Sequence, residues 1–296
     1  MTLIKPSILI SNTFDPLSRD EEHVMKLYQT IADLNYYNAI ETRIIFNTQV
    51  QKEFADLATL HEWYVTFWVT GNLNNLAFRL NNLNESERIK AVDQVKIYCD
   101  LAVKSNAKAI GFCSGKTEGH PLEEQEQFFK SVVSILVHAR KYEELDIIIE
   151  PLDSSSDKRN TLGDLETSLS FFQRINSSGL NHDKRIRCCI DTAHFALNND
   201  NLSETIKELS IYSDRVHFAN AILDPSHIDY GDKHIAIGDP GFLDKGYCIE
   251  LYEQCRTLDF ISKDTYLTIE ERVLDQQKMF EKESEHREFL NTLRAI

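Results

Sequence analysis

Short runs of hydrophobic residues alternate with longer amphipathic segments along the whole chain. Such unbroken apolar runs are typical of strands that are buried on both faces of a parallel sheet. They predict eight strands, which cover residues 7–11, 42–46, 63–70, 109–113, 145–150, 186–191, 215–219 and 265–270.

The amphipathic segments between these runs have the spacing of helices. In residues 21–34, hydrophobic side chains recur every three or four positions, which places them on one helical face. Asn84 and Glu87 together form a helix start signal before another such segment. We predict helices at residues 21–34, 84–104, 121–141, 162–175, 203–212, 245–258 and 275–293. The connections after the second and third strands carry weaker patterns.

The order of these elements predicts one fold. A strand followed by a helix, repeated around a closed sheet, is typical of the (β/α)8 TIM barrel, an α/β fold of about 250 residues. The chain has 296 residues with only 10 Gly and 6 Pro, which leaves little material for interdomain linkers. We therefore predict a single TIM-barrel domain over residues 1–296. A doubly wound open sheet is the alternative, but no G-x-G-x-x-G sequence follows the first strand.

The charge balance narrows the classes of partner. Lys+Arg 32 against Asp+Glu 47 gives a formal net charge of −15. An acidic surface repels phosphate groups, so nucleic acids and anionic membranes are unfavourable partners. A small molecule is the partner that we expect, and the sequence leaves a homo-oligomer open.

The cysteine pattern and the lack of long hydrophobic runs favour a location in the cytoplasm. No hydrophobic run approaches the ~18 residues that a membrane span requires, and the segment MTLIKPSILISNTF lacks the apolar core of a signal peptide. The six cysteines include no C-x-x-C pair, which fits buried thiols in a reducing compartment. We therefore expect a cytoplasmic protein without a membrane segment.

Four predicted strands end in groups that can bind a metal or move a proton. Three carboxylates directly follow apolar runs, and an imidazole lies close to the end of the seventh strand: Glu150, Asp191, Glu270 and His217. Active sites of TIM barrels lie at the carboxyl ends of the strands, so these side chains should share one rim. Three carboxylates at close range repel one another unless a cation lies between them. The pattern therefore predicts a divalent metal.

Further candidate residues follow the sixth and seventh strands. His194 comes three residues after Asp191, where it can contact a substrate oxygen or a second metal. Residues 220–243 lack periodicity and contain Asp232 and His234, and long irregular stretches in compact domains are usually functional. We expect these two residues at a second metal, although one metal remains the alternative.

Two more side chains are expected to contact the substrate. Trp68 ends the third strand, where its ring can form the apolar wall of a sugar pocket. Lys233, in the irregular stretch, can meet a phosphate or carboxylate, as can Lys116 after the fourth strand.

These motifs together carry a resemblance to a known family. The matching pieces are Glu150-Pro-Leu, Asp191-x-x-His194, Val216-His217-Phe, Asp232-Lys-His234-x-x-x-Gly238, Ile269-Glu270 and the segment of residues 82–112. In this order they resemble the xylose isomerase-like TIM-barrel superfamily, which includes sugar isomerases and epimerases, inosose dehydratases and zinc-dependent apurinic/apyrimidinic endonucleases. The resemblance implies that Glu150, Asp191, His217 and Glu270 bind one divalent metal and that His194 touches the substrate.

The leading hypothesis is a metal-dependent isomerase or epimerase of a small sugar or polyol derivative. Three carboxylates and one imidazole suit Mn²⁺ or Mg²⁺, with Zn²⁺ and Co²⁺ as alternatives. Glu150 or Glu270 would take the proton next to a carbonyl, and the enediolate would be reprotonated by the opposite glutamate. Ketose 3-epimerases carry a further glutamate and an arginine that this chain lacks, so isomerase, other epimerase and dehydratase chemistry stay open.

Two other functions are alternatives. The Asp232-Lys-His234 sequence resembles an Asp-Arg-His motif of the endonuclease branch. The trinuclear zinc site of that branch needs two further histidines at the ends of strands three and four, and residues 67–70 and 112–115 contain none. A barrel that binds a ligand without turnover is the other alternative, although it would be expected to have lost a ligand residue first.

Overall fold

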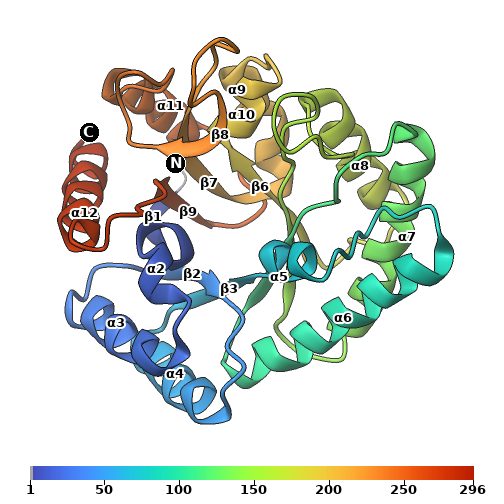
Figure 1. The fold of residues 1–296 in the computed structure, drawn as a ribbon, viewed down its shortest axis with the longest axis horizontal. Coiled ribbons are helices and arrows are strands. Elements are labelled where there is room, and N and C mark those ends of the chain that lie inside the picture. The colour runs from blue at the N-terminus through green and yellow to red at the C-terminus, as the bar shows by residue number, and fades with distance from the viewer. Residues whose placement is uncertain (1–2) are drawn as a thin grey trace.

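Eight parallel strands form a closed barrel, and helices surround it (Figure 1). The computed structural model describes residues 3–296. The barrel strands are β1 Leu3–Leu9, β2 Ala39–Arg43, β3 Tyr64–Trp68, β4 Ala109–Phe112, β5 Asp146–Ile149, β6 Ile186–Asp191, β7 Ser213–Ile222 and β9 Asp264–Glu270. Neighbours in sequence pair in parallel around the ring, and pairing of β1 with β9 closes it. The predicted TIM barrel is thereby confirmed.

The outer ring consists of the longer helices. They are α3 Glu21–Asp33, α4 Thr48–Leu60, α6 Glu85–Lys104, α7 Pro121–Ala139, α8 Leu165–Ser177, α10 Leu202–Leu209, α11 Lys245–Thr257 and α12 Met279–Ala295. Their hydrophobic faces pack on the outside of the strands in one continuous core. The helix start predicted at Asn84 is confirmed, because its side chain accepts hydrogen bonds from the backbone of Ser86 and Glu87.

Shorter elements follow several strands directly. They are the helices α1 Ile10–Thr13, α2 Asp15–Ser18, α5 Thr70–Asn75 and α9 Thr192–Leu197, and the 3-10 turn η1 Ser210–Tyr212. In Figure 1, α5 lies near the centre of the ring, in front of the barrel strands. These short helices begin where the strands end, so they bring loop residues close to the carboxyl end of the barrel.

The second strand differs from its predicted position. We expected it at residues 42–46, whereas β2 spans Ala39–Arg43. The prediction followed the hydrophobic run of residues 44–46, but β2 contains Glu41, whose side chain is fully buried inside the barrel. Because a charged residue interrupts the hydrophobic run, the run does not mark the true position of this strand.

The stretch of residues 220–243 is also more ordered than its sequence predicts. Strand β7 continues to Ile222, and β8, Gly231–Ile235, pairs with it in antiparallel register. Side chains alternate along a strand. Asp232 and His234 are therefore buried on one side of β8, while Lys233 between them is exposed.

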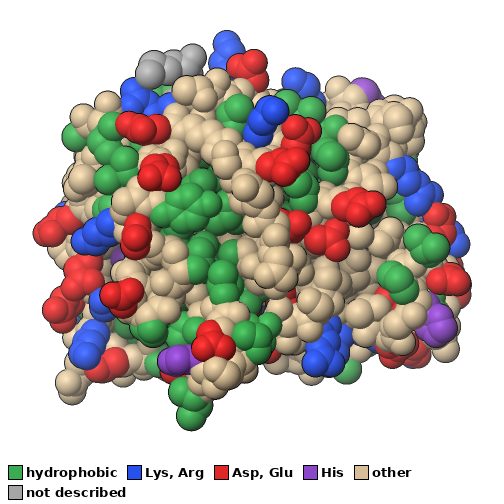
Figure 2. Space-filling model, turned by 90° about the horizontal axis from the view of Figure 1, so that it is seen from above, with side chains coloured by type: hydrophobic (Ala, Val, Ile, Leu, Met, Phe, Trp, Pro, Cys, Tyr) green, Lys and Arg blue, Asp and Glu red, His purple; other side chains and the backbone are tan. Residues whose placement is uncertain are grey.

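The surface carries side chains of mixed character, and the thiols lie in the interior. Figure 2 shows acidic, basic and hydrophobic side chains interspersed over one face of the molecule. Every helix within residues 3–296 is too short or too polar to cross a bilayer. All six cysteines are free and buried.

Candidate metal centre

Four side chains converge at the carboxyl end of the barrel strands. Glu150, Asp191, His217 and Glu270 each offer one ligand atom, and these atoms all lie within 4.8 Å of one another. Strand pairing places them there, because Asp191 is opposite His217 and Glu270 is opposite Ala219, two residues further along β7. The sequence-based expectation that these four residues share one rim therefore agrees with the structure.

The two ring nitrogens of His217 face different carboxylates. Nδ1 lies 2.6 Å from Glu270 Oε2 and 3.8 Å from Glu150 Oε1, so it points into the cluster. Nε2 lies 3.0 Å from Glu41 Oε1 and 3.2 Å from Glu41 Oε2. A metal-binding histidine commonly donates its second N–H to a carboxylate, which fixes the ring. His217 has this arrangement, with Nδ1 as the candidate ligand.

Glu41, a buried neighbour of the candidate ligand His217, is a residue of the candidate site that sequence reasoning missed. Ser7 Oγ and Thr268 Oγ1 donate to its Oε1 at 3.0 and 2.9 Å, and Trp68 Nε1 donates to Oε2 at 2.8 Å. Arg215 Nη1, itself buried, lies 3.2 Å from the same Oε2. Burial raises the pKa of Glu41, but the charges of His217 and Arg215 outweigh it and hold the pKa well below its usual range. Glu41 is therefore a fixed negative charge behind His217.

The carboxylates of the cluster have opposite electrostatic environments. Burial, reinforced by the charge of Glu270, raises the pKa of Glu150 to about 8. Burial likewise raises the pKa of Asp191 to about 7. Burial also acts on Glu270, but the nearby His234 and His217 outweigh it and lower its pKa to about 2. The cluster thus holds three buried carboxylates against one histidine, a set that a divalent cation would neutralise.

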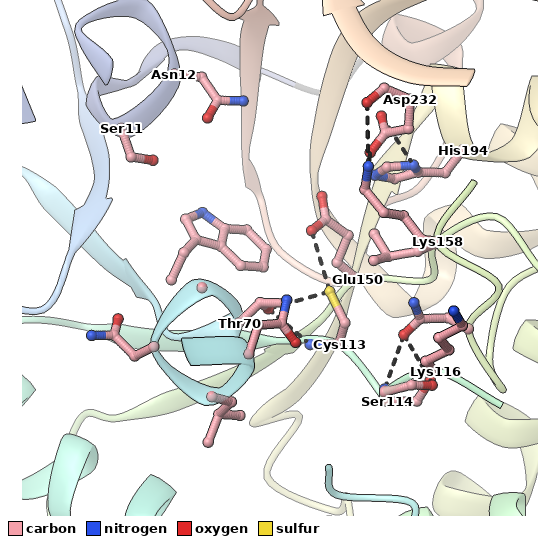
Figure 3. Close-up of a pocket in the computed structure, with 18 of the residues that line it drawn as sticks. Ser11, Asn12, Thr70, Cys113, Ser114, Lys116, Glu150, Lys158, His194 and Asp232 are labelled. Atoms are coloured by element: carbon pink, nitrogen blue, oxygen red, sulfur yellow. Dashed lines mark hydrogen bonds and ion pairs between the residues drawn. The ribbon is translucent and has the colours of Figure 1, made fainter. Parts of the chain in front are cut away.

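A second group of potential ligands adjoins the first and shares Asp191. Ligand atoms of Asp191, His194 and His234 lie within 4.8 Å of one another. Asp232 joins them, since its Oδ1 lies 2.9 Å from His234 Nε2 and 3.7 Å from His194 Nδ1. The residues expected at a second metal are therefore brought together. Figure 3 shows Asp232 and His194 beside each other, across from Glu150.

Buried atoms without hydrogen-bond partners mark this second group. Among residues 3–296, Asp191 Oδ2 and His194 Nδ1 are buried without a hydrogen bond, whereas the buried Asp232 Oδ1 and His234 Nε2 face each other at 2.9 Å. Burying a polar atom without a hydrogen-bond partner lowers the free energy of unfolding by about 1–3 kcal/mol. A cluster of such atoms therefore indicates a bound partner, such as an ion. All four carry lone pairs that can bind a cation once the imidazole nitrogens are deprotonated. The donor set therefore fits a divalent metal.

A cavity of about 500 Å³ opens above both groups. Its wall includes Glu150, His194, His217, Asp232, His234, Glu270 and the ring of Trp68. The indole N–H of Trp68 is used by Glu41, so only the ring is available to a ligand. A cavity of this size accepts a small molecule of sugar dimensions.

The lysine at this cavity differs from the predicted one. Lys233 was expected to contact the substrate, but its side chain is exposed on the other side of β8 and does not line the cavity. Lys158 lines it instead, and its Nζ lies 3.0 Å from Asp232 Oδ2 and 2.8 Å from Asp157 Oδ2. The strand alternation of β8, which the sequence did not reveal, is the reason.

The ends of β3 and β4 bring a threonine and a thiol to the cluster. Thr70 Oγ1 lies 3.3 Å from Cys113 Sγ, which lies 3.7 Å from Glu150 Oε2 (Figure 3). On the other side of this carboxylate, Cys189 Sγ lies 3.9 Å from Glu150 Oε1. Burial raises the pKa of the Cys113 thiol, so it stays protonated at neutral pH in the absence of metal.

Comparisons with known proteins agree with this architecture. A family model described as a xylose isomerase-like TIM barrel matches residues 29–295. No curated protein sequence matches the chain significantly. Among solved structures, a D-tagatose 3-epimerase-like protein is 18% identical with a TM-score of 0.70, and the match covers 98% of this chain and 99% of that one.

Two further solved structures are similar at low identity. An IolI protein with a zinc atom is 13% identical with a TM-score of 0.72, and the match covers 98% of each chain. A family 2 AP endonuclease from Brucella melitensis is 14% identical with a TM-score of 0.67, covering 96% of this chain and 100% of that one. At these identities the likeness shows the fold alone.

Proposed function

Because the chain belongs to the xylose isomerase-like TIM-barrel family, we propose that it is a divalent-metal-dependent isomerase or epimerase of a small sugar or polyol derivative. One observation carries the proposal. Three carboxylates and one imidazole nitrogen converge within 4.8 Å at the floor of a cavity of about 500 Å³. Such a mixed, oxygen-rich set suits Mn²⁺ or Mg²⁺, and the histidines also admit Zn²⁺ or Co²⁺.

Two groups of residues would hold metal ions. Glu150, Asp191, His217 and Glu270 form the first, and His194, Asp232 and His234 form the second together with Asp191. A bound divalent cation supplies Lewis acid chemistry, which polarises a carbonyl and stabilises negative charge on the neighbouring oxygen. Because Glu150 and Glu270 of the first group line the cavity, we assign proton transfer to this group.

Glu150 is the better placed of the two glutamates to accept a proton. Its side-chain neighbours are distant, with the thiols of Cys113 and Cys189 at 3.7 and 3.9 Å and His217 Nδ1 at 3.8 Å. Glu270, by contrast, accepts a hydrogen bond of 2.6 Å from Asn12 Nδ2 and lies 2.6 Å from His217 Nδ1. A weakly hydrogen-bonded carboxylate with a raised pKa is the stronger base once ionised.

The proton balance of the reaction follows from this assignment. Glu150 takes the proton from the carbon next to the substrate carbonyl, and the electron pair of that C–H bond moves into the enediolate. If protonated Glu150 returns its proton to the neighbouring carbon, and a proton moves between the two enediolate oxygens, the product is an isomer. If the original carbon is instead protonated from the other side, the product is an epimer; Glu270, ionised at rest, then relays a proton from solvent to that carbon, and Glu150 releases its proton to solvent.

The exchange of substrate hydrogen with solvent tests this function. Metal-loaded protein would be incubated in D₂O with unphosphorylated and phosphorylated ketoses, and loss of the proton next to the carbonyl followed by NMR. We expect metal-dependent exchange that Glu150→Gln abolishes and that excess chelator removes. Full exchange or turnover in chelator contradicts the proposal. Tight sugar binding without any exchange would instead indicate a non-catalytic barrel.

The second group of ligands favours one other function. His194, Asp232 and His234 recreate one part of the endonuclease-like zinc cluster, so hydrolysis at abasic sites is the second candidate. Thr70 and Cys113 stand where that cluster needs further histidines, which argues against it. Incision of an abasic duplex by the zinc-loaded protein, abolished by Asp232→Asn, would establish this alternative.

A further inference from the structure

The cavity wall carries more positive charge than the rest of this acidic protein would suggest. Five cationic side chains line it, although the chain has a formal net charge of −15: Arg43, Arg79, Lys116, Lys158 and Arg272. Three of them pair with carboxylates, namely Arg43 with Asp15, Arg79 with Glu118 and Lys158 with Asp157. Among residues 3–296, the side chains of Lys116 and Arg272 make neither an ion pair nor a hydrogen bond.

Arg43 and Arg272 stand on the same wall, beside the metal centre. Arg43 ends β2, and Arg272 follows Glu270 by two residues. The backbone N–H of Arg272 donates to the carbonyl of His234 at 2.8 Å, and the next residue, Val273, donates to Asn12 at 3.0 Å. The backbone of Arg272 is therefore hydrogen-bonded to a residue of the second candidate metal group and lies two residues after Glu270 of the first, while its side chain is exposed at the cavity.

The guanidinium group of Arg43 is held from behind. Its Nη2 lies 2.6 Å from Asp15 Oδ1 and 3.2 Å from the carbonyl oxygen of Ser11. Nη1 makes no hydrogen bond within the described part of the chain and faces Gly71, where a Cβ atom would lie 3.9 Å from it. One edge of a rigid, planar cation is thus left open toward the cavity.

Positive charges outnumber negative ones around this position. The buried Asp15 is shared, since Arg19 Nη2 also lies 2.8 Å from its Oδ2. Burial lowers the pKa of Arg43, and the charges of Arg19 and Arg272 lower it further, against the opposing effect of Asp15. Arg19 and Arg43 share the one carboxylate of Asp15, and Arg272 adds a further positive charge that acts on Arg43. An anion in the cavity would relieve the repulsion between these guanidinium groups.

We propose that Arg43 and Arg272 form an anion subsite of the cavity, so that the substrate turned over at the metal centre is a sugar or polyol derivative with a phosphate ester or a carboxylate. Guanidinium groups bind both anions with paired, charge-assisted hydrogen bonds. The proposal rests on the proposed function in taking this cavity as the substrate site. It also replaces Lys233, which faces away, with cations that line the cavity.

A matched series of three-carbon ligands tests the subsite without requiring turnover. Glycerol, glycerol 3-phosphate and glycerate differ only in the group at one end, and calorimetry would measure their binding to the metal-loaded protein. We expect at least one of the two anions to bind about tenfold more tightly than glycerol. A tenfold change in affinity is what one charge-assisted hydrogen bond contributes. The anion with the larger preference identifies the phosphate or the carboxylate as the natural group.

Variants separate the subsite from direct binding to the metal. Arg272→Gln should remove most of the preference for the anion, and Arg272→Lys, which keeps the charge but not the planar fork, should remove less. Arg43→Gln provides a second variant on the same wall. Lys104→Gln, an exposed cation near the end of α6, should change nothing. A preference that persists in both arginine variants, or an absence of any preference, overturns the subsite.

The same measurement distinguishes this proposal from the proposed function. If Arg272-dependent anion binding is found but no hydrogen exchange occurs, the subsite stands and the isomerase assignment fails. If an anionic ketose exchanges its hydrogen with equal efficiency in Arg272→Gln and the wild type, the isomerase assignment stands and the anion subsite fails.

Discussion

His217 Nε2 and Glu41 Oε1 lie 3.0 Å apart, on strands β7 and β2 of the barrel. This pair sets the orientation of the imidazole ring, so Nδ1 points at Glu150 and Glu270. A proton on Nε2, shared with Glu41, leaves the lone pair of Nδ1 free for a metal. We therefore expect metal binding at His217 to depend on Glu41, a residue outside the candidate ligand group.

Removal of the negative charge of Glu41 tests this dependence. We expect Glu41→Gln to weaken Mn²⁺ binding by about 10–100-fold, the usual effect of losing the carboxylate behind a metal-binding histidine. Isothermal titration of the chelator-treated protein measures the affinity. Thr268→Val is the matched control, since it removes one neutral donor to Glu41 and keeps the charge. Equal affinity in Glu41→Gln and the wild type would show that Glu41 does not support His217.

The second group of ligands predicts the metal stoichiometry. We expect the wild type to bind two Zn²⁺ ions and His234→Asn to bind one, because His234 belongs to the second group only. Metal analysis after gel filtration counts the ions in each variant. His227→Asn, in the same loop but outside the cavity wall, should keep both. A single ion in the wild type, unchanged by His234→Asn, would remove the second site.

The position of Trp68 depends on a glycine of the neighbouring strand. A Cβ atom on Gly111 would lie 2.4 Å from the Trp68 ring, so Gly111→Ala must displace the indole and break its hydrogen bond to Glu41. Overpacking of this kind costs about 1–3 kcal/mol. We expect a lower melting temperature and altered tryptophan fluorescence. Gly71→Ala, whose added Cβ would meet only Arg43 at 3.9 Å, is the control. Unchanged fluorescence in Gly111→Ala would contradict the packing described.

The raised carboxylate pKa values predict how metal affinity depends on pH. Without metal, the pKa of Glu150 is raised to about 8 and that of Asp191 to about 7, in both cases mainly by burial. The pKa of His217 is also raised well above its usual value, because neighbours that include Glu41 and Glu270 outweigh the effect of burial. A metal must displace all these protons, so Mn²⁺ affinity should rise with pH through pH 8. For each proton that the metal displaces, the Mn²⁺ binding constant should rise by up to about tenfold per pH unit. Titrations with Mn²⁺ at a series of pH values measure this dependence. An affinity that does not change with pH would show that these groups are already deprotonated and would contradict the prediction.

The same shifts predict opposite stability profiles with and without metal. Groups whose pKa is higher in the folded state stabilise the metal-free protein at low pH, and this contribution is lost as pH rises through the folded-state pKa. Glu150, Asp191 and His234, whose pKa is raised to about 10 by Asp232 and Glu270 against the effect of burial, all act in this direction. We expect the melting temperature of the metal-free protein to fall between about pH 6 and pH 9. That of the metal-loaded protein should rise or stay constant over the same range.

The sequence predicts much of the barrel and most of the first metal group, for a physical reason. Glu150, Asp191 and Glu270 stand directly after apolar runs, so a search for strand ends finds them without further information. Because parallel strands deliver their carboxyl ends to one rim, the spatial cluster follows from the order of the elements.

The residues that sequence reasoning missed owe their roles to tertiary contacts. Glu41 can be buried because β1, β3, β7 and β9 supply hydrogen-bond and ion-pair partners for its carboxylate. The local sequence of β2 contains no pattern that predicts these partners. The choice between Lys233 and Lys158 depends on the register of the β7–β8 hairpin, which only the fold reveals. The side chains of Arg43 and Arg272 likewise come from parts of the chain that are far apart in sequence, and their charges interact only in the folded protein.

Titration of the chelator-stripped protein with Mn²⁺ tests the central claim most directly, with Asp191→Asn measured beside the wild type. Asp191 belongs to both ligand groups, so its variant removes a ligand from each. We predict saturable binding of at least one ion by the wild type and a loss of about 100-fold or more in Asp191→Asn, with the fold retained. Absence of saturable binding by the wild type, or equal binding by the variant, would contradict the assignment of this cluster as a metal centre.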